Sequence, residues 1–125
     1  MAISEQKMTQ CPLEYTLGYI GGKWKMVILW RLSGDCVMRY SEIKKKVSQI
    51  SHKMLSQQLK ELENDRLITR TDYHQIPPRV EYSLTNRGIS LIPLLKSAFE
   101  WGQHDFYSQT TDNDFNSQRK VSKQK

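Results

Sequence analysis

The sequence predicts a mainly helical domain with a small β-sheet, an α+β fold, and three observations support this class. Apolar residues recur three or four positions apart along much of the first half of the chain and again towards its end. Two runs of strand-forming residues, Leu67 to Tyr73 and Arg79 to Leu84, flank a loop that holds Pro77 and Pro78. The chain has 125 residues, 38% of them hydrophobic, which suits one domain with its own core.

The first predicted helix follows a polar segment, residues 1–10, which is expected to be a flexible N-terminus. This helix begins at Pro12, because proline is favoured at the first helical position, and Cys11 therefore falls at the N-cap. The pair Gly21 and Gly22 ends the helix.

A core helix, a turn and a strand are predicted next. The helix spans Lys23 to Leu32 and is apolar on most of its faces, as helices buried in a core are. Ser33 to Asp35 form the turn, and Cys36 to Arg39 form a short strand that would complete a three-stranded sheet. A third, short helix covers Ser41 to Val47.

The fourth helix, which follows a turn at residues 48–50, is the most informative element. Ser51 suits its N-cap, because a serine hydroxyl can accept from the free amides of the first turn. One side of the helix is apolar and consists of Leu55, Leu59 and Leu62. Another side is polar and carries Lys53, Gln57, Lys60 and Asn64. Ammonium and amide groups read phosphates and base edges in the major groove, so this is a candidate recognition helix.

The rest of the chain is predicted to form a hairpin and one long helix. The prolines prevent strand pairing across residues 74–78, so the two strands form a hairpin. The last helix runs from Asn86 to about Tyr107, with Thr85 as N-cap and a kink at Pro93. Residues 108–125 are predicted to be a disordered polar tail, so that one domain covers residues 11–107. A helix-turn-helix followed by a two-stranded hairpin is a winged helix-turn-helix.

Charge and hydropathy limit the function classes. The 19 Lys and Arg residues exceed the 13 Asp and Glu residues, and the net charge of +6 favours a polyanionic partner. The longest apolar run, Met26 to Trp30, is too short to cross a bilayer, so we expect no membrane association and a cytoplasmic location. The histidines lack partners at ligand spacing, and no nucleophile–base pair is visible. We therefore expect no metal, no cofactor and no catalysis.

Five segments carry a family resemblance: residues 11–15 (CPLEY), 20–25 (IGGKWK), 39–43 (RYSEI), 50–63 (ISHKMLSQQLKELE) and 77–85 (PPRVEYSLT). Together they resemble, in order and spacing, segments of the HxlR-type transcriptional regulators, over about Cys11 to Gly102. The resemblance implies a small winged-helix regulator with MarR-like architecture that acts as a homodimer on operator DNA. It also implies a dimer contact built by the first and last helices, and an N-terminal cysteine that senses quinones, aldehydes or oxidants in several members.

Double-stranded DNA is therefore the expected partner. The predicted contacts are Ser51, His52, Lys53, Ser56, Gln57 and Lys60 on the recognition helix, Lys44 and Lys45 on the helix before it, Lys23, and Arg79 in the wing. Lys53 and Gln57 are the best candidates for base contacts, because residues near the start of a recognition helix enter the groove. The alternatives are a solvated polar face, a solubilising run of lysines and a wing tip that is simply exposed.

Cys11 is a candidate sensor of a small-molecule electrophile or oxidant. At an N-cap, the free amides and the helix dipole favour a thiolate and so raise its reactivity. The alternative is a small N-cap residue without chemistry. Cys36 is predicted to be a structural residue at the sheet edge, and a disulfide between the two cysteines stays open.

The last helix carries more apolar surface than one small core can cover, which favours a homodimer over burial within one subunit. The predicted dimer contact consists of Leu13, Leu17, Ile92, Leu95, Phe99 and Trp101. Two other function classes compete with a DNA-binding regulator. A winged-helix protein-interaction module fits the cationic helix face poorly. A thiol redox enzyme built on Cys11 lacks a second cysteine at CxxC spacing.

Overall fold

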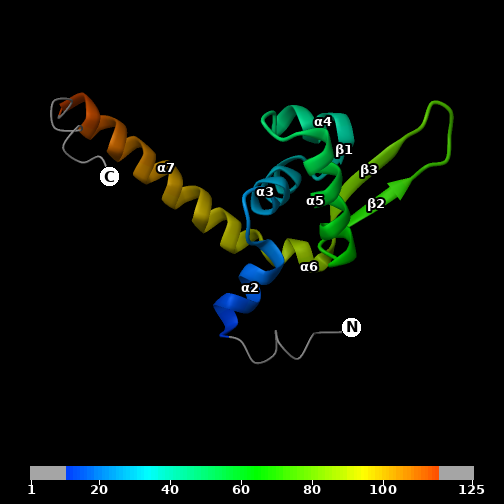
Figure 1. Cartoon of the computed structure of the whole chain (residues 1–125), viewed down its shortest axis with the longest axis horizontal. Helices are drawn as coiled ribbons and strands as arrows, with labels where there is room; N and C mark the ends of the chain where they lie inside the picture. Colours follow the sequence, from blue (N-terminus) through cyan, green and yellow to red (C-terminus); the bar gives the residue numbers. More distant parts are fainter. Residues whose placement is uncertain (1–10, 116–125) are drawn as a thin grey trace. The chain divides into compact units, whose positions relative to one another are not determined.

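The computed structural model describes residues 11–115 and divides into two compact units after Ile92 (Figure 1). The helices of the first unit are α2 (Pro12–Ile20), α3 (Lys25–Asp35), α4 (Tyr40–Lys46), α5 (His52–Asn64) and α6 (Asn86–Ile89). Its strands are β1 (Val37–Arg39), β2 (Ile68–Asp72) and β3 (Val80–Leu84). The second unit is built on the helix α7 (Ile92–Phe115). The predicted class, mainly helical with a small sheet, is confirmed.

The sheet has three antiparallel strands in the order β1-β3-β2. The central strand β3 pairs Glu81 with Arg39 of β1 on one side and with Thr71 of β2 on the other. The predicted short strand therefore completes the sheet, as expected. The hairpin formed by β2, β3 and the loop between them, residues 68–84, is the wing (Figure 1).

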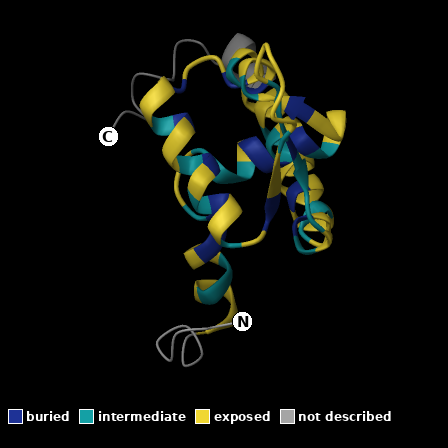
Figure 2. Ribbon diagram, turned by 90° about the vertical axis from the view of Figure 1, so that its right-hand side faces the viewer, coloured by how far each residue is buried: buried dark blue, intermediate teal, exposed yellow. Residues whose placement is uncertain are grey.

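The core of the first unit is apolar, and among the described residues no polar or charged side chain is buried. Its fully buried side chains are Ile20, Ile28, Leu29, Leu32, Met38, Ile43, Ile50, Leu55, Leu59, Leu62, Leu67 and Ile68. In Figure 2 the ribbon is dark blue wherever a residue is buried. Every helix and strand from α2 to β2 contributes to this set, because each of these elements turns one apolar side inward, and Ile50 and Leu67 come from the connections. The burial of all three leucines of α5 confirms the apolar face predicted for that helix.

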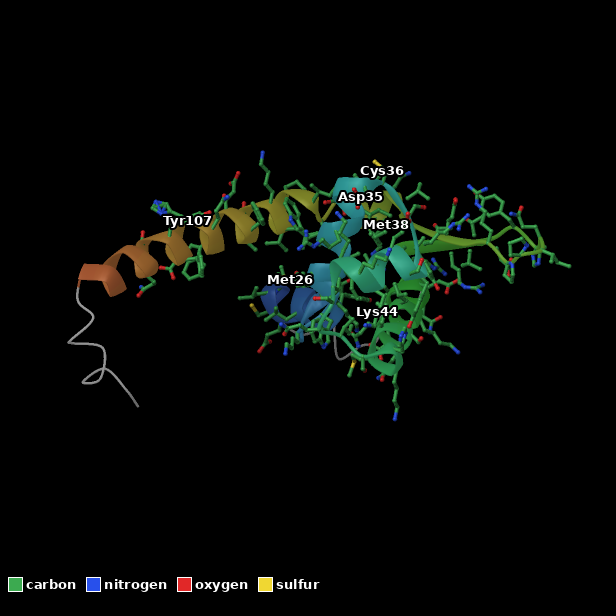
Figure 3. The ribbon with its side chains drawn as sticks, turned by 90° about the horizontal axis from the view of Figure 1, so that it is seen from above. Met26, Asp35, Cys36, Met38, Lys44 and Tyr107 are labelled. Atoms are coloured by element: carbon green, nitrogen blue, oxygen red, sulfur yellow. The ribbon has the colours of Figure 1, made fainter. Side chains whose placement is uncertain are left out.

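Helix α3 ends later than predicted. The predicted turn over Ser33 to Asp35 is the last turn of the helix, where the Ser33 hydroxyl donates to the Trp30 carbonyl at 2.6 Å. The helix stops at Cys36, whose φ of 71° lies in the left-handed region and whose N–H still donates to the Leu32 carbonyl. Cys36 is therefore the C-cap, next to Asp35 at the end of α3 (Figure 3), and the strand begins one residue later.

The single kinked helix predicted after Thr85 is wrong, because the structure has two helices there. Thr85 is the N-cap as predicted, and its hydroxyl accepts from the Gly88 N–H at 3.0 Å. Pro93 has no N–H to donate to the carbonyl of Ile89, four residues earlier, so α6 ends at Ile89. The chain restarts as α7 with the proline in its first turn, where no N–H is needed.

The boundary predicted for the tail also needs correction, since α7 continues to Phe115 and residues 108–115 are helical. The N-terminal segment 1–10 and the end of the predicted tail, 116–125, lie outside the described residues. Within residues 11–115, no helix has the length and apolar character needed to cross a membrane.

Candidate nucleic-acid interface

The helix-turn-helix is fixed at both of its helix starts by local hydrogen bonds. At the start of α4, the backbone N–H of Arg39 donates to Glu42 Oε1 at 2.8 Å. At the start of α5, the Ser51 hydroxyl accepts from the Met54 N–H at 3.0 Å, which confirms the predicted N-cap. Ile50 between them is buried and anchors the turn in the core. The orientation of α5 is thus set by its cap and by its apolar side.

The polar side of α5 faces solvent. Lys53, Gln57 and Lys60 are all exposed, as predicted, while the leucines of the opposite side are buried. Within residues 11–115, neither of the two lysines takes part in an ion pair. Their charges are therefore available to an anionic partner.

Glu61 connects α5 to the core helix α3. Its carboxylate lies 2.6 Å from Lys25 Nζ and accepts from the Gln57 amide at 3.2 Å. The Lys25 hydrogen bond, and after it the Gln57 amide, lower the pKa of the Glu61 carboxyl. The Gln57 side chain is therefore oriented by a neighbour one turn further along α5, although it remains exposed.

Tyr40 joins the two helices of the motif through a contact that the sequence pattern does not reveal. Its hydroxyl oxygen lies 3.0 Å from His52 Nδ1, 3.2 Å from the His52 carbonyl oxygen and 3.4 Å from Ser56 Oγ. The Tyr40 and His52 rings stack with centroids 5.8 Å apart and an interplanar angle of 13°. The structure thus brings two predicted contact residues, His52 and Ser56, onto one tyrosine.

A cleft of about 340 Å³ lies between α5 and the sheet. It is lined by Tyr40, Ser56, Leu59, Lys60, Glu63, Arg70 and Tyr82. Arg70 adds a cation that the sequence analysis did not single out, on a strand that it assigned only to the hairpin. Its Nη2 lies 4.0 Å from Asp72 Oδ2 of the same strand. The alternation of side chains along β2 was the available signal, because it puts exposed Thr69 and Thr71 on the face opposite to Arg70.

The other predicted lysines differ in their surroundings. Lys44 on α4 (Figure 3) is half-buried and Lys45 is exposed. Nζ of Lys46, the next residue, lies 3.8 Å from Asp35 Oδ2. Lys23 precedes α3, is exposed, and places its ammonium group 4.7 Å from the centre of the Trp24 ring.

The charged side chains of the wing pair with one another. Arg79 Nε and Nη2 donate to Glu81 Oε2 at 2.9 and 2.7 Å, and the guanidinium lies 4.9 Å from the centre of the Tyr73 ring. Tyr73 also donates its hydroxyl to Glu81 Oε1 at 2.9 Å. The bonds from Arg79 and Tyr73 lower the pKa of the Glu81 carboxyl, and the carboxylate raises the pKa of Tyr73. Residues two apart on a strand share a face, so the sequence did hold the signal for the Arg79–Glu81 pair.

Cys11 is the N-cap of α2, as predicted. Its side chain is exposed, and both cysteines are free. Its backbone N–H donates to Glu14 Oε1 at 3.3 Å, so a carboxylate lies at the same helix end. The prediction from the helix dipole did not take that carboxylate into account. Cys36 is exposed as well, at the C-cap of α3.

The predicted dimer residues are mostly exposed apolar side chains. In α2, Leu13 is 65% exposed and Leu17 is 50% exposed. In α7, Phe99 and Trp101 are exposed, Ile92 is partly buried and Leu95 is buried.

Comparison with known proteins agrees with this geometry. The family model of the HxlR-like helix-turn-helix matches residues 19–110. The regulatory protein MalR of Fusobacterium mortiferum is 51% identical over 96 residues, which cover 77% of this chain and 91% of MalR. The HTH-type transcriptional regulator YdzF of Bacillus subtilis is 54% identical over 93 residues, covering 74% of this chain and 85% of YdzF.

Solved structures give the same result. The redox regulator HypR in its reduced form is similar with a TM-score of 0.74 at 40% identity, covering 81% of this chain and 99% of HypR. Its oxidised form gives a TM-score of 0.72 at 44% identity, over 75% of this chain and 96% of HypR. These relatives are transcriptional regulators and not enzymes. The chain therefore belongs to the HxlR-like helix-turn-helix family of transcriptional regulators.

Proposed function

We propose that this protein is a sequence-specific DNA-binding regulator that acts as a homodimer, with α5 in the major groove of operator DNA. One observation carries the proposal: α5 presents Lys53, Gln57 and Lys60 to solvent while its leucines anchor it in the core. A helix held in this way can enter a groove without losing its own packing. The groove supplies the phosphates and base edges that these groups recognise. Operator binding would place the protein in the cytoplasm.

The contacts divide by position. Lys53 and Gln57 lie near the N-terminal end of α5, where side chains reach base edges. Lys44 and Lys45 on α4 would contact phosphates, together with Lys23. Arg79 contributes less in this scheme, because Glu81 already neutralises its charge.

The homodimer would form through the apolar side chains of α2 and α7. Leu13 and Leu17 of α2 are at least half exposed, and Trp101 of α7 is 71% exposed. Burial of such side chains against a second copy would remove apolar surface from water. Two symmetric subunits would then present their α5 helices about 34 Å apart, one turn of duplex DNA.

Thiol modification of Cys11 would control this regulator. Cys11 is exposed at the start of α2, the helix that carries two of the proposed dimer residues. A structurally similar relative, HypR, is a redox regulator. Addition of the thiolate to a quinone, or its oxidation, would alter the start of α2 and so the spacing of the two α5 helices.

The test of DNA binding is fluorescence anisotropy with a labelled duplex from the DNA that flanks this protein's own gene, and with a scrambled duplex. We expect selective binding that Lys53→Ala weakens. The matched control is Arg31→Ala, which removes the same charge from an exposed position of α3. Equal affinity for both duplexes would contradict the proposal and favour a protein-interaction module.

The dimer and the thiol are tested separately. Sedimentation should show a dimer that dissociates when Leu13 and Leu17 are both changed to glutamate, but not when the wing-tip residue Ile76 is changed to glutamate.

Treatment with a quinone should change operator affinity in the wild type and in Cys36→Ser, but not in Cys11→Ser. A response that persists in Cys11→Ser would remove the sensor and keep the regulator.

A further inference from the structure

We infer that Tyr40 is a positioning residue for base readout: its hydroxyl holds the His52 imidazole in the tautomer with the proton on Nε2, and so presents a hydrogen-bond donor at the start of α5. The inference rests on the proposed function, because the donor acts only if α5 meets DNA. It is carried by the contacts of one hydroxyl group with His52 and Ser56.

Tyr40 stands at a rigid junction. It directly follows β1, whose last residue, Arg39, pairs with Glu81 in the central strand. The backbone N–H of Arg39 donates to Glu42, and this bond fixes the first turn of α4. The backbone of Tyr40 is therefore held by the sheet and by the cap, while its side chain reaches to α5.

The proton on the tyrosine hydroxyl goes to His52 Nδ1. A hydroxyl can donate one hydrogen bond and accept two. The His52 carbonyl oxygen, 3.2 Å away, is the other acceptor within reach of this proton, but one of its two lone pairs already accepts the N–H four residues further along α5. The Nδ1 contact is the shortest, at 3.0 Å, and at 3.4 Å Ser56 can donate its own hydroxyl to the tyrosine oxygen. Nδ1 is then an acceptor, and the neutral ring carries its proton on Nε2.

This arrangement gives α5 a defined donor. The His52 ring is exposed, and its plane is set by the stack on Tyr40. A donor at the start of a recognition helix matches the acceptors N7 and O6 on purines in the major groove. The ring of an unheld histidine could rotate and offer either a donor or an acceptor. The Tyr40 hydroxyl removes that ambiguity and so acts on selectivity more than on general affinity.

The decisive variant is Tyr40→Phe, which keeps the ring and removes the hydroxyl. Its matched control is Tyr82→Phe. Tyr82 lines the same cleft and, within residues 11–115, makes no hydrogen bond to α5. Both variants keep the aromatic packing, so a general effect of losing a hydroxyl from this cleft would be the same in the two proteins.

The first measurement uses the free protein and requires no DNA. Long-range ¹H–¹⁵N correlation spectra of the neutral His52 ring should show the proton on Nε2 and an unprotonated Nδ1. Because loss of a donated hydrogen bond changes the nitrogen resonance, the Nδ1 signal should move in Tyr40→Phe and stay in place in Tyr82→Phe. A proton on Nδ1 in the wild type, or an unmoved Nδ1 signal in Tyr40→Phe, would overturn the inference.

The second measurement is a double-mutant cycle on operator affinity. We expect Tyr40→Phe to weaken operator binding roughly five- to tenfold, with non-specific binding changed less than about twofold. In a His52→Ala background, Tyr40→Phe should have an effect below about twofold. The inference would be overturned if Tyr40→Phe had its full effect in the His52→Ala background, or if it weakened binding to operator and to non-specific DNA equally. Tyr40 would then only hold α4 and α5 together. Absence of any selectivity in the wild type would refute the proposed function instead, and the spectra would still decide on Tyr40.

Discussion

Helix α5 and the wing hold equal numbers of cations and anions but arrange them differently. Each has two Lys or Arg residues and two Asp or Glu residues. In α5, Glu61 turns to Lys25 of the core helix, and this leaves Lys53 and Lys60 without ion pairs among the described residues. In the wing, the anions pair with the wing's own cations, with Arg79 only 2.7 Å from Glu81.

The difference shows that formal charge alone does not identify a DNA contact. A cation contributes to salt-dependent binding only if it can neutralise a phosphate and release counterions. A cation that already neutralises a carboxylate must first lose that partner. We therefore expect α5 to carry the electrostatic part of binding, and the wing to add little to it.

The largest effect should come from removing both lysines of α5. In the double variant Lys53→Ala, Lys60→Ala, the loss of a base contact should make the free energy of operator binding about 1–3 kcal/mol less favourable. The loss of phosphate neutralisation should weaken binding further. The slope of log affinity against log salt should fall by about 0.9 for each phosphate that is no longer neutralised. Anisotropy titrations at several salt concentrations measure both quantities.

The matched control for that variant is Arg31→Ala combined with Lys96→Ala. Both residues are exposed, on α3 and α7, and the control removes the same formal charge. If the control reduced affinity and slope as much as the α5 variant, net charge rather than the face of α5 would explain binding, and the contrast between helix and wing would fail.

The sequence could predict the part of this interface that depends on local spacing. Leu55, Leu59 and Leu62 recur at helical intervals, and Ser51 precedes them at cap distance, so both faces of α5 and its start were predicted correctly. The sequence also held the signal for the end of α6, because Pro93 leaves the carbonyl four residues earlier without a donor. The sequence analysis predicted only a kink at Pro93, whereas the helix ends there and a new one begins.

Tertiary contacts explain what the sequence did not reveal. Tyr40 reaches His52 and Ser56, which lie 12 and 16 positions away, only because α4 packs at one particular angle beside α5. No local periodicity encodes that angle. Cys36 ends α3 with a positive φ of 71°, a backbone angle that residues other than glycine rarely adopt, and residue type alone would not place it there.

A smaller effect is expected in the wing. Arg79→Ala should weaken operator binding less than about threefold and should change the salt slope by less than about one unit. Glu81→Gln should act in the opposite direction, because it releases the guanidinium from its carboxylate partner. Anisotropy titrations of these two variants and of Lys53→Ala under the same conditions rank their effects on operator affinity. If Arg79→Ala weakened binding as much as Lys53→Ala, DNA would have to displace Glu81, and the wing would rank with α5.

The smallest effect concerns the acid stability of the wing. The pKa of the Glu81 carboxyl is lowered in the folded protein, chiefly by the hydrogen bonds from Arg79. The stabilisation is therefore fully present above the ordinary pKa of a glutamate and is lost as the pH falls through the lowered value. Thermal unfolding should show the wild type more stable than Glu81→Gln near pH 7. That difference should shrink from about pH 5 downward.

The Arg79→Ala background isolates the pair in the same unfolding experiment. Without the guanidinium, the main cause of the lowered Glu81 pKa is gone, although the Tyr73 hydroxyl still donates to the carboxylate. The pH-dependent part of the stability change caused by Glu81→Gln should therefore become smaller in that background. An unchanged pH dependence would mean that Arg79 is not held by Glu81 in solution. The Arg79 guanidinium would then be as available to phosphate as the lysines of α5, and the contrast between the two regions would disappear.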